Sequence, residues 1–271
     1  MGGAILNTER IEDIPGFPEG IPGFDFGPRL QEQVAGAGAT IEPAGVTRIE
    51  RRGDDWAVAT ESSEITVGAM VVATGSRPRK LGVAREDELE GKGLSHCASC
   101  DGPLFRGRTV AMVGGGDSAL LETLELGGHD VQVVLIHEGE ALGGQETYRR
   151  RVHESTYVDV RHRSVVEEIL GDHSVEGLRL RDLAGEESTT VAVSAVFVHV
   201  GRVPNTELLA GVVALDEHGK VATDTLMRTE LPGLFAAGDI RADSAGQAIT
   251  AAGDGATAAV AAHRYLAERS A

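Results

Sequence analysis

The chain has 271 residues, of which 41% are apolar and 25% charged, and its 42 acidic and 25 basic side chains give a formal charge of −17. Such a length and composition indicate a globular protein of two ordinary domains or one large one, and they exclude a disordered or fibrous chain. The excess of negative charge repels phosphate backbones and anionic membranes. We therefore expect neither a nucleic-acid partner nor a membrane partner.

The first residues contain neither a basic segment nor an apolar stretch, and no run of about 18 apolar residues occurs in the chain. We expect no signal peptide, no membrane span and a cytoplasmic location. Only two cysteines are present, Cys97 and Cys100. Two cysteines do not make a secreted disulfide framework and supply half of a four-cysteine zinc site, so a redox pair is the leading interpretation.

The first predicted elements are a loop and a strand. Glycine and proline crowd Asp13–Gly27, and we interpret this stretch as a loop. Val71–Gly75 is a short apolar run that ends in glycine. Such a run indicates a buried parallel strand.

A β-α-β unit is predicted in the middle of the chain. Thr109–Val113 is an apolar run that leads directly into Gly114–Gly116. Asp117–Leu126 has helical composition and ends at two glycines, and Val131–Ile136 is the next apolar run. Strand, turn, helix and strand therefore follow one another in the order of a nucleotide-binding unit.

The last third of the chain continues the alternation. Val191–Val200 and Gly233–Ala237 are apolar runs, and the alanine-rich Gln247–Leu266 predicts a closing helix. Strands that alternate with helices indicate an α/β fold. A weak echo between Ala73–Pro78 and His199–Asn205, each with glycine and proline after an apolar strand, favours two similar nucleotide-binding halves.

The turn after Thr109–Val113 has the spacing of a dinucleotide fingerprint. Gly114 permits the tight turn, Gly116 lets a pyrophosphate approach the backbone, and the small Ala119 lets the helix pack on the strand. Free N–H groups at the start of the helix favour a phosphate. The alternative interpretation is a glycine-rich turn without a ligand.

The end of the next strand discriminates between NADH and NADPH, because an acid there accepts a hydrogen bond from the ribose 2′-hydroxyl. The sequence has Glu138 at this point, which favours NADH. The alternative is that Glu138 is an ordinary solvated acid. Arg149–Arg151 follow closely enough to reach a 2′-phosphate instead.

The C-x-x-C spacing of Cys97 and Cys100 allows the two sulfurs to cycle between dithiol and disulfide. A protonated His96 can stabilise a thiolate, and Asp101 can exchange a proton with a thiol. Two alternatives remain, namely a zinc site with two further ligands and a pair of inert core cysteines.

Taken together, these landmarks resemble those of the low-molecular-weight thioredoxin reductases and the related flavoprotein component of alkyl hydroperoxide reductase. The matching motifs occur in the family's order along nearly the whole chain: GG at Gly2-Gly3, PGFP at Pro15–Pro18, ATG at Ala73–Gly75, CASCDG at Cys97–Gly102, GGGDSA at Gly114–Ala119, VPNT at Val203–Thr206, AAGD at Ala236–Asp239 and QAITAAGDGATAA at Gln247–Ala259.

The resemblance implies two Rossmann-like domains, with a nicotinamide domain at residues 89–207 inserted into a discontinuous FAD domain at residues 1–88 and 208–271. In the family, hydride passes from the nicotinamide to FAD, then to the disulfide, and finally to a partner's disulfide. By position, Cys100 matches the flavin-proximal thiol, Cys97 the thiol that attacks the partner, and Asp101 the acid that manages the thiol proton. A rotation between the domains lets the cysteine pair meet the flavin and the partner in turn.

The resemblance also implies which residues bind the cofactors. The FAD contacts are Gly3, Thr74, Gly75, Gly238, Asp239, Gln247 and Ala248. The nicotinamide dinucleotide lies over Gly114, Gly115, Gly116, Asp117, Ser118 and Ala119, with Glu138 at its ribose. Further cofactor contacts are implied at Gly2, Asp13, Val46 and Gly201. The implied partner is a thioredoxin-like or peroxidase-type disulfide protein, and the implied assembly is a homodimer.

The largest departure from the family lies at the start. In the family an FAD-binding β-α-β unit of about 30 residues or more precedes the GG motif, and this sequence begins at that motif. We expect a chain without that unit to bind FAD poorly, because the FAD pyrophosphate loses its helix N-terminus. A truncated start, a second polypeptide that supplies the unit, and a non-catalytic relative are the three explanations.

Smaller departures concern other cofactor contacts. Ala4 stands where the family usually has Gln, Asp13 where it has Asn, and Gly246 where it has Arg. Glu138-Gly139 replaces the arginine pair that holds the 2′-phosphate of NADPH in other members. We predict an FAD- and NAD(P)H-dependent disulfide oxidoreductase that prefers NADH. The alternatives are a flavin dithiol oxidase that uses oxygen and a catalytically silent nucleotide-binding protein.

Overall fold

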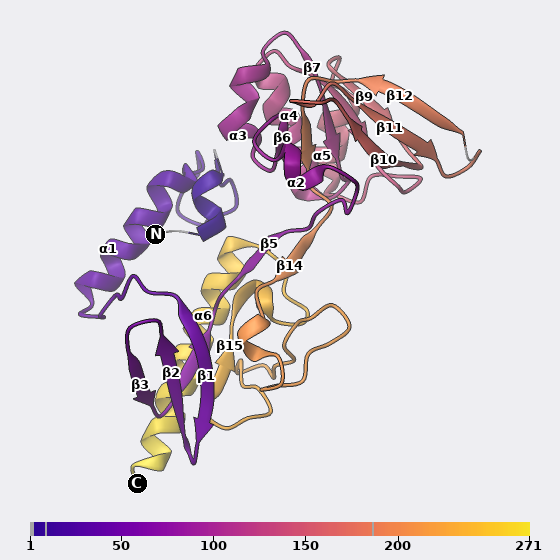
Figure 1. The fold of residues 1–271 in the computed structure, drawn as a ribbon. Coiled ribbons are helices and arrows are strands. Elements are labelled where there is room, and N and C mark those ends of the chain that lie inside the picture. The colour runs from indigo at the N-terminus through magenta and orange to yellow at the C-terminus, as the bar shows by residue number, and fades with distance from the viewer. Residues whose placement is uncertain (1–2, 9, 186) are drawn as a thin grey trace. The chain divides into compact units, whose positions relative to one another are not determined.

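The computed structural model describes residues 3–8, 10–185 and 187–271, and the chain divides into two compact units (Figure 1). Unit 1 combines Met1–Arg77 with Val203–Ala271, and unit 2 is Pro78–Arg202. Both divisions lie earlier along the chain than the boundaries expected at 88/89 and 207/208. Among the described residues, no helix is long and apolar enough to cross a membrane.

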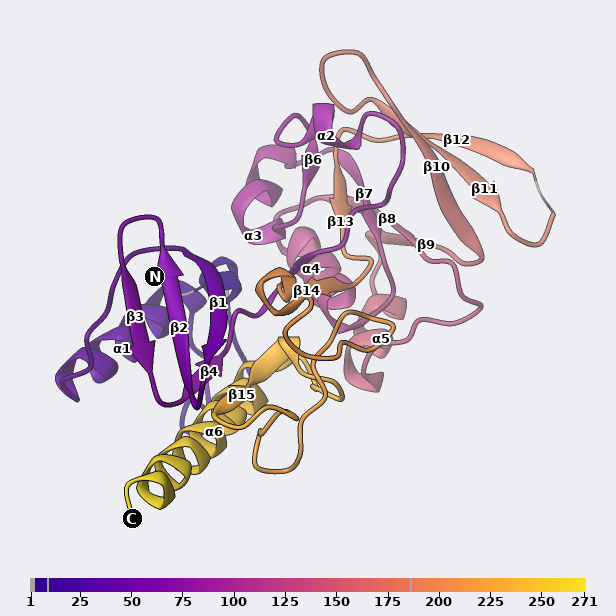
Figure 2. The ribbon, with the colours of Figure 1, turned by 60° about the horizontal axis from the view of Figure 1, so that its bottom comes forward.

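Unit 2 is built on a parallel sheet whose strand order is β6-β13-β7-β8-β9 (Figure 2). Its strands are β6 (Leu94–Ser95), β7 (Thr109–Val113), β8 (Gln132–Ile136), β9 (Val158–Arg161) and β13 (Val196–Val198). Every neighbouring pair in this sheet is parallel. The predicted unit of strand, glycine turn, helix and strand is therefore present as β7, α4 (Asp117–Gly128) and β8.

The two faces of this sheet are covered by different layers. Val110, Met112, Val133 and Leu135 pack with side chains of α4 and with Val152 of α5 (Glu146–His153). The alternate residues of β7 and β8 point to the other face, since successive side chains of a strand alternate. They pack with Ile169, Leu178 and Leu180 of a second sheet.

This second sheet is an antiparallel meander of β10 (Ser164–Leu170), β11 (Gly177–Asp182) and β12 (Ser188–Ala192). The apolar run Val191–Val200 was expected to contribute a strand, and that prediction is wrong in part, because the run belongs to two sheets. Val191 and Ala192 are the last two residues of β12, and Val196–Val198 form β13 of the parallel sheet. Val193–Ala195 connect the two sheets. Every residue from Val193 to Val198 except Ser194 is buried. The hydrophobic pattern therefore continues through the connection and does not reveal the change of sheet.

Unit 1 contains two small sheets. The antiparallel one has β1 (Val46–Arg52), β2 (Asp55–Thr60) and β3 (Glu64–Val67), and the parallel one pairs β15 (Leu234–Ala236) with β4 (Met70–Val72). The buried Trp56 of β2 donates from Nε1 to the carbonyl of Pro232 over 3.2 Å, which ties the antiparallel sheet to the segment before β15.

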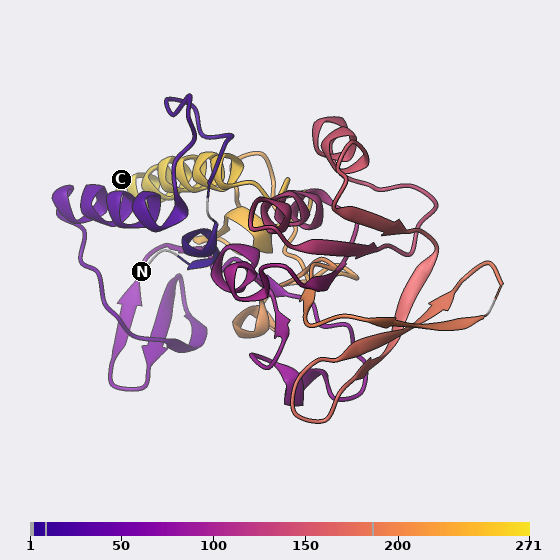
Figure 3. The same cartoon turned by 90° about the horizontal axis from the view of Figure 1, so that it is seen from above.

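The helices of unit 1 are η1 (Gly3–Asn7), α1 (Gly23–Gly36), η3 (Glu207–Leu209), η4 (Gly238–Ile240) and the long C-terminal α6 (Ala248–Arg269) (Figure 3). The expected loop over Asp13–Gly27 ends early, because α1 begins at Gly23. A Cβ at Gly23 would lie 1.8 Å from the carbonyl oxygen of Ile5. The glycine that favoured a loop therefore serves a close contact between backbone segments.

The remaining elements are short: β5 (Ser76–Pro78), α2 (Glu86–Leu89), α3 (Ala98–Asp101), η2 (Gly102–Phe105) and β14 (Arg202–Pro204). β5 and β14 pair with each other. They are the glycine- and proline-containing segments whose similarity suggested two halves. The similarity thus coincides with the two places where the chain passes from one unit to the other.

Candidate active site

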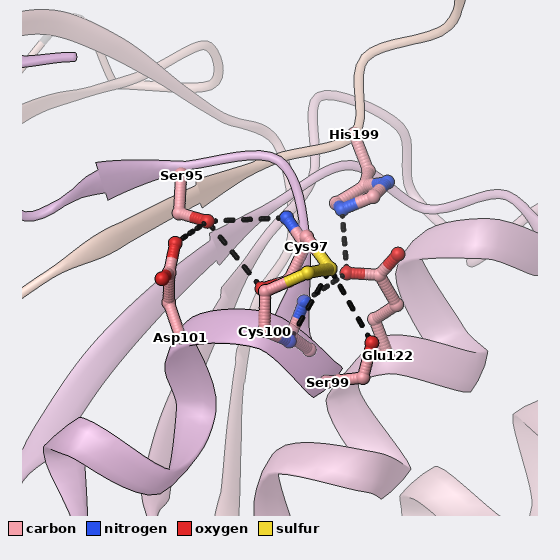
Figure 4. The surroundings of a disulfide bond; sticks show 8 residues. Ser95, Cys97, Ser99, Cys100, Asp101, Glu122 and His199 are labelled. Carbon is pink, nitrogen blue, oxygen red and sulfur yellow. Dashed lines mark hydrogen bonds and ion pairs between the residues drawn. A yellow bond between two sulfur atoms is a disulfide. The ribbon is translucent and has the colours of Figure 1, made fainter. Parts of the chain in front are cut away.

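Cys97 and Cys100 form a disulfide, with their Cα atoms 5.4 Å apart (Figure 4). Cys97 follows β6 and is the N-cap of the short helix α3, and its sulfur accepts a hydrogen bond from the backbone N–H of Cys100 over 3.2 Å. The bonded pair fits a redox centre. Cys97 is only 8% exposed whereas Cys100 is exposed, and the implied division of labour between the two thiols stays a prediction.

Asp101 is held beside the cysteine pair by Ser95. The Ser95 hydroxyl donates to Oδ2 of Asp101 over 2.6 Å and accepts the N–H of Cys97 over 3.1 Å. Ser95 itself is buried. One hydroxyl therefore links the carboxylate to the cysteine turn, and the carboxylate directly follows Cys100, where it can exchange a proton with that thiol.

Two further side chains approach the disulfide and have no motif in the sequence. Glu122 of α4 accepts the N–H of Ala98 at Oε2 over 2.8 Å. His199, which directly follows β13, places Nε2 2.9 Å from the same oxygen. The only sequence signal for His199 is its position at the carboxyl end of a parallel strand, where sites of α/β sheets gather.

His96 was considered as a partner of the thiolate. Its Nδ1 lies 3.0 Å from the carbonyl oxygen of Val198, and its Nε2 lies 3.6 Å from Oε2 of Glu90. Both ring nitrogens thus face groups other than the sulfurs. The role of His96 at the cysteine pair stays a prediction.

The glycine turn has the geometry that a pyrophosphate requires. Gly114 has φ +141°, and a Cβ there would lie 2.2 Å from the carbonyl oxygen of His199. Gly116 is the N-cap of α4, has no side-chain cap, and has open space where a Cβ would be. The first N–H groups of a twelve-residue helix are therefore uncapped beside open space, and this arrangement fits a phosphate.

The other residues of this turn have distinct contacts. A Cβ at Gly115 would lie 2.4 Å from Nδ1 of His137. Asp117 accepts the backbone N–H of Gln145 at Oδ1 over 2.6 Å, so its carboxylate holds the loop after β8. Ser118 lies in the first turn of α4, and the buried Ala119 packs against the strands.

Glu138 lies two residues after β8 and is exposed. Within the part of the chain that the structure describes, it has no hydrogen bond or ion pair, so the carboxylate is available to a ligand. Arg149 pairs with Glu146 within α5, and Arg150 and Arg151 are exposed on the same helix.

The predicted FAD residues of unit 1 gather where β4 and β15 end. Thr74 and Gly75 follow β4, and Gly238 and Asp239 follow β15. The Ser76 hydroxyl donates to Oδ2 of Asp239 over 2.6 Å, which joins the two strand ends. Gln247 is the N-cap of α6, and Ala248 is its first residue.

This edge of unit 1 fits a bound dinucleotide in three respects. Gly75 and Gly238 have φ values of +68° and +75°, with nothing nearer than 3.5 Å to a Cβ at either position. The N-terminus of α6 has no side-chain cap. Asp239 supplies an acceptor for a hydroxyl.

The remaining predicted cofactor residues are dispersed. Gly3 begins η1, and Asp13 is exposed between Ile11 and Ile14, which pack in one cluster with Ala248. Val46 begins β1, where it pairs with Thr60 of β2. Gly201 lies in unit 2 and accepts the N–H of Arg79. Gly2 lies outside the described residues.

Comparison with known proteins supplies the family. Residues 3–255 match the pyridine nucleotide-disulphide oxidoreductase family. The thioredoxin reductase of Treponema pallidum is 37% identical over 265 residues, covering 98% of this chain and 86% of that protein. The thioredoxin reductase of Streptomyces clavuligerus is 39% identical over 269 residues, covering 98% and 83%.

A solved structure agrees with these relatives. The crystal structure of Lactococcus lactis thioredoxin reductase in the FR conformation superposes with a TM-score of 0.95 at 35% identity, and the match covers 98% of this chain and 88% of that one. The expected α/β class with two Rossmann-like units, and the expected enzyme class, are confirmed. The chain therefore belongs to the pyridine nucleotide-disulphide oxidoreductase family and, within it, to the thioredoxin reductases.

Proposed function

We propose that the protein reduces a thioredoxin-like protein with electrons from NADH, through FAD and the Cys97–Cys100 pair. The observation that carries this proposal is the oxidised pair of unit 2, which lies in the same unit as an uncapped glycine turn. Bound FAD supplies a two-electron relay between the dihydronicotinamide and the disulfide. The names of the relatives support thioredoxin as the partner.

The residues of unit 2 account for the thiol chemistry. Two electrons and two protons convert the disulfide to two thiols, and a thiolate of this pair then attacks the partner's disulfide. A mixed disulfide forms and one partner sulfur leaves as a thiolate. The second cysteine displaces the other partner sulfur, which restores the Cys97–Cys100 disulfide and leaves the partner as a dithiol. Asp101, fixed by Ser95, carries the proton at Cys100.

The preference for NADH follows from Glu138. An exposed, unpaired carboxylate after β8 accepts from a ribose 2′-hydroxyl and repels a 2′-phosphate. Arg149 is the first arginine after Glu138 in the sequence, and it already pairs with Glu146. This arrangement supports NADH over NADPH.

The same proposal covers partner, assembly and location. Leu104, four residues after Cys100 in sequence, is 72% exposed, and an exposed apolar side chain this close in sequence to the disulfide supports docking of a protein substrate. A peroxidase-type disulfide protein is the alternative partner. We place the enzyme in the cytoplasm, because thiols persist in that compartment. The proposed assembly is a homodimer.

Anaerobic reduction of thioredoxin by the flavin-loaded protein tests the proposal. We expect NADH to bleach the flavin and to drive thioredoxin reduction, with NADPH at least about tenfold less efficient. Cys97→Ser and Cys100→Ser should each abolish thioredoxin reduction. Oxygen consumption with small dithiols and no bleaching by NADH would establish the dithiol oxidase instead. A colourless protein that binds only nucleotide would establish the silent relative.

Variants of two neighbouring acids test the choice of dinucleotide. Glu138→Gln should raise the KM for NADH by about tenfold, because one charged hydrogen bond is lost. The difference in KM between NADH and NADPH should become smaller. Glu140→Gln is the matched control, since Glu140 is an exposed acid two residues further along the same loop. Equal effects of the two variants would contradict the assignment of Glu138.

A further inference from the structure

Glu122 and His199 form a second polar pair beside the disulfide, on the other side of it from Asp101 in Figure 4. His199 Nε2 lies 2.9 Å from Glu122 Oε2, and the two side chains are 12% and 21% exposed. The same Oε2 accepts the N–H of Ala98, the residue that follows Cys97. The carboxylate is therefore bonded to the cysteine turn itself.

Both members of this pair are fixed by their backbones. Glu122 lies within α4, and the backbone N–H of His199 donates to the carbonyl of Val113 over 2.8 Å. The carbonyl of His199 occupies the space above Gly114. The buried Nε2 is at ion-pair distance from the carboxylate, but it is not aligned for a hydrogen bond. The imidazole therefore attracts the carboxylate through charge in the form in which it is protonated.

The charge of this pair bears on the chemistry of the reduced cysteines. A carboxylate near a thiol opposes formation of the thiolate, because like charges repel at low effective dielectric. The thiolate is the nucleophile of disulfide exchange. An imidazole takes up a proton between about pH 5 and 8, and the cation cancels the charge of its carboxylate partner.

We propose that His199 is a positioning residue that neutralises Glu122 and so sets the fraction of the reduced Cys97–Cys100 pair that is thiolate near neutral pH. The proposal rests on the redox role of the pair given above. It deepens that role, because it identifies a charge pair outside the cysteine motif that controls the readiness of the dithiol to attack a partner.

Other ionisable groups lie on the elements that form or adjoin the site, and they stay constant across the variants used below. The turn before α3 contributes His96 with Glu90, and α3 contributes Asp101. α4 itself contributes Asp117 and Glu125, and α5 contributes Arg149. The sequences of β7, β8 and η2 contain no ionisable side chain. A comparison of variants at positions 122 and 199 therefore isolates the charge of this pair.

The test is a thiolate titration of the reduced full-length chain, followed by ultraviolet absorbance against pH and corrected with the oxidised protein. His199→Gln leaves Glu122 uncompensated, so the pH midpoint at which the first thiolate forms should rise by about 0.5 unit. At a given pH below that midpoint, the variant should then contain about threefold less thiolate than the parent. Glu122→Gln keeps an acceptor for the N–H of Ala98 and removes the charge, so the midpoint should fall by about the same amount.

The double variant His199→Gln/Glu122→Gln should return the midpoint to that of the parent, which a purely structural role would not do. His153→Gln, an exposed histidine in the last turn of α5, is the matched control and should change nothing. Thermal unfolding of each variant verifies folding, and His199→Asn replaces His199→Gln if the longer amide does not fit.

Shifts of the two single variants in the same direction, or no shift in either, would overturn the proposal. The titration uses neither a dinucleotide nor flavin nor thioredoxin. It therefore succeeds or fails independently of the assay that tests the proposed function.

Discussion

The ring of Tyr157 occupies the space that a side chain at Gly127 would need: a Cβ at that position would lie 1.8 Å from Cε2 of the ring. Gly127 is the penultimate residue of α4, and the Tyr157 hydroxyl donates to the carbonyl of Leu124 in the same helix over 3.3 Å. The pair thereby ties the C-terminal end of α4 to the segment before β9.

This contact predicts that substitution by alanine affects the stability of the protein differently at two adjacent glycines. Gly127→Ala should destabilise the protein by about 1–3 kcal/mol, because the partly buried ring must shift from its packed position against the core. Gly128→Ala is the matched control, since nothing lies within 4 Å of a Cβ there. It should be neutral or stabilising by up to about 1 kcal/mol through helix propensity. Denaturant unfolding of both variants measures the difference, and equal stabilities would contradict the packing.

Asp101 is expected to act on the thiol proton. Asp101→Asn should lower the rate of thioredoxin reduction by about 100-fold, because a proton-transfer group is lost while the shape is kept. Ser95→Ala should cost about tenfold, since it removes the hydroxyl that holds the carboxylate. Steady-state assays with the flavin-loaded protein measure both.

Asp130→Asn is the control for Asp101, because Asp130 is an exposed acid of the same unit that pairs with Arg106. It should keep full activity. An Asp101→Asn protein as active as the parent would remove Asp101 from the mechanism.

Leu104 is expected to contact the protein partner. Leu104→Glu should raise the KM for thioredoxin by about tenfold, because an exposed apolar side chain four residues after Cys100 in sequence is replaced by a charge. Reduction of the disulfide by the dinucleotide should be unchanged in the same protein. Leu183→Glu is the control, since Leu183 is a 43% exposed leucine after β11. A similar rise in both variants would indicate a general effect of charge.

Asp224 is expected to make unit 1 less stable in acid. Its pKa lies below the ordinary value, mainly because the backbone N–H of Arg228 donates to the carboxylate, with help from the Arg228 side chain and the N–H of Leu226. A carboxyl group whose pKa is lower in the folded state stabilises the fold above the unfolded value of about 3.9. That contribution is lost as the pH falls through the folded pKa.

Asp224→Asn should therefore lower the thermal midpoint at pH 7 by about 1–2 °C, and the difference should shrink as the pH falls from the unfolded value of about 3.9 through the lower folded pKa. The expected effect is small because the carboxylate is largely in solvent. Asp54→Asn, at an exposed position in the turn between β1 and β2, should show no difference at pH 7 or in this acidic range. A difference between parent and Asp224→Asn that stays the same from pH 7 into this acidic range would contradict the linkage.

Local sequence predicted the elements whose signal lies within a few neighbouring residues. The strand predicted at Thr109–Val113 has the bounds of β7. The helix predicted at Gln247–Leu266 begins one residue before α6. Both depend on composition and on the glycines that flank them. The predictions over Asp13–Gly27 and Val191–Val200 were wrong in part, because Gly23 serves a contact with Ile5 and Val193–Ala195 serve a change of sheet.

The sequence by itself determined the family, the α/β class and the identity of the redox pair, because each of these rests on motifs that are contiguous in the chain. Only the tertiary structure decided which groups surround the pair. Ser95, Glu122 and His199 come from β6, from α4 and from the end of β13. They meet at the disulfide because parallel strands bring distant segments to one edge of a sheet, an arrangement that no local pattern encodes.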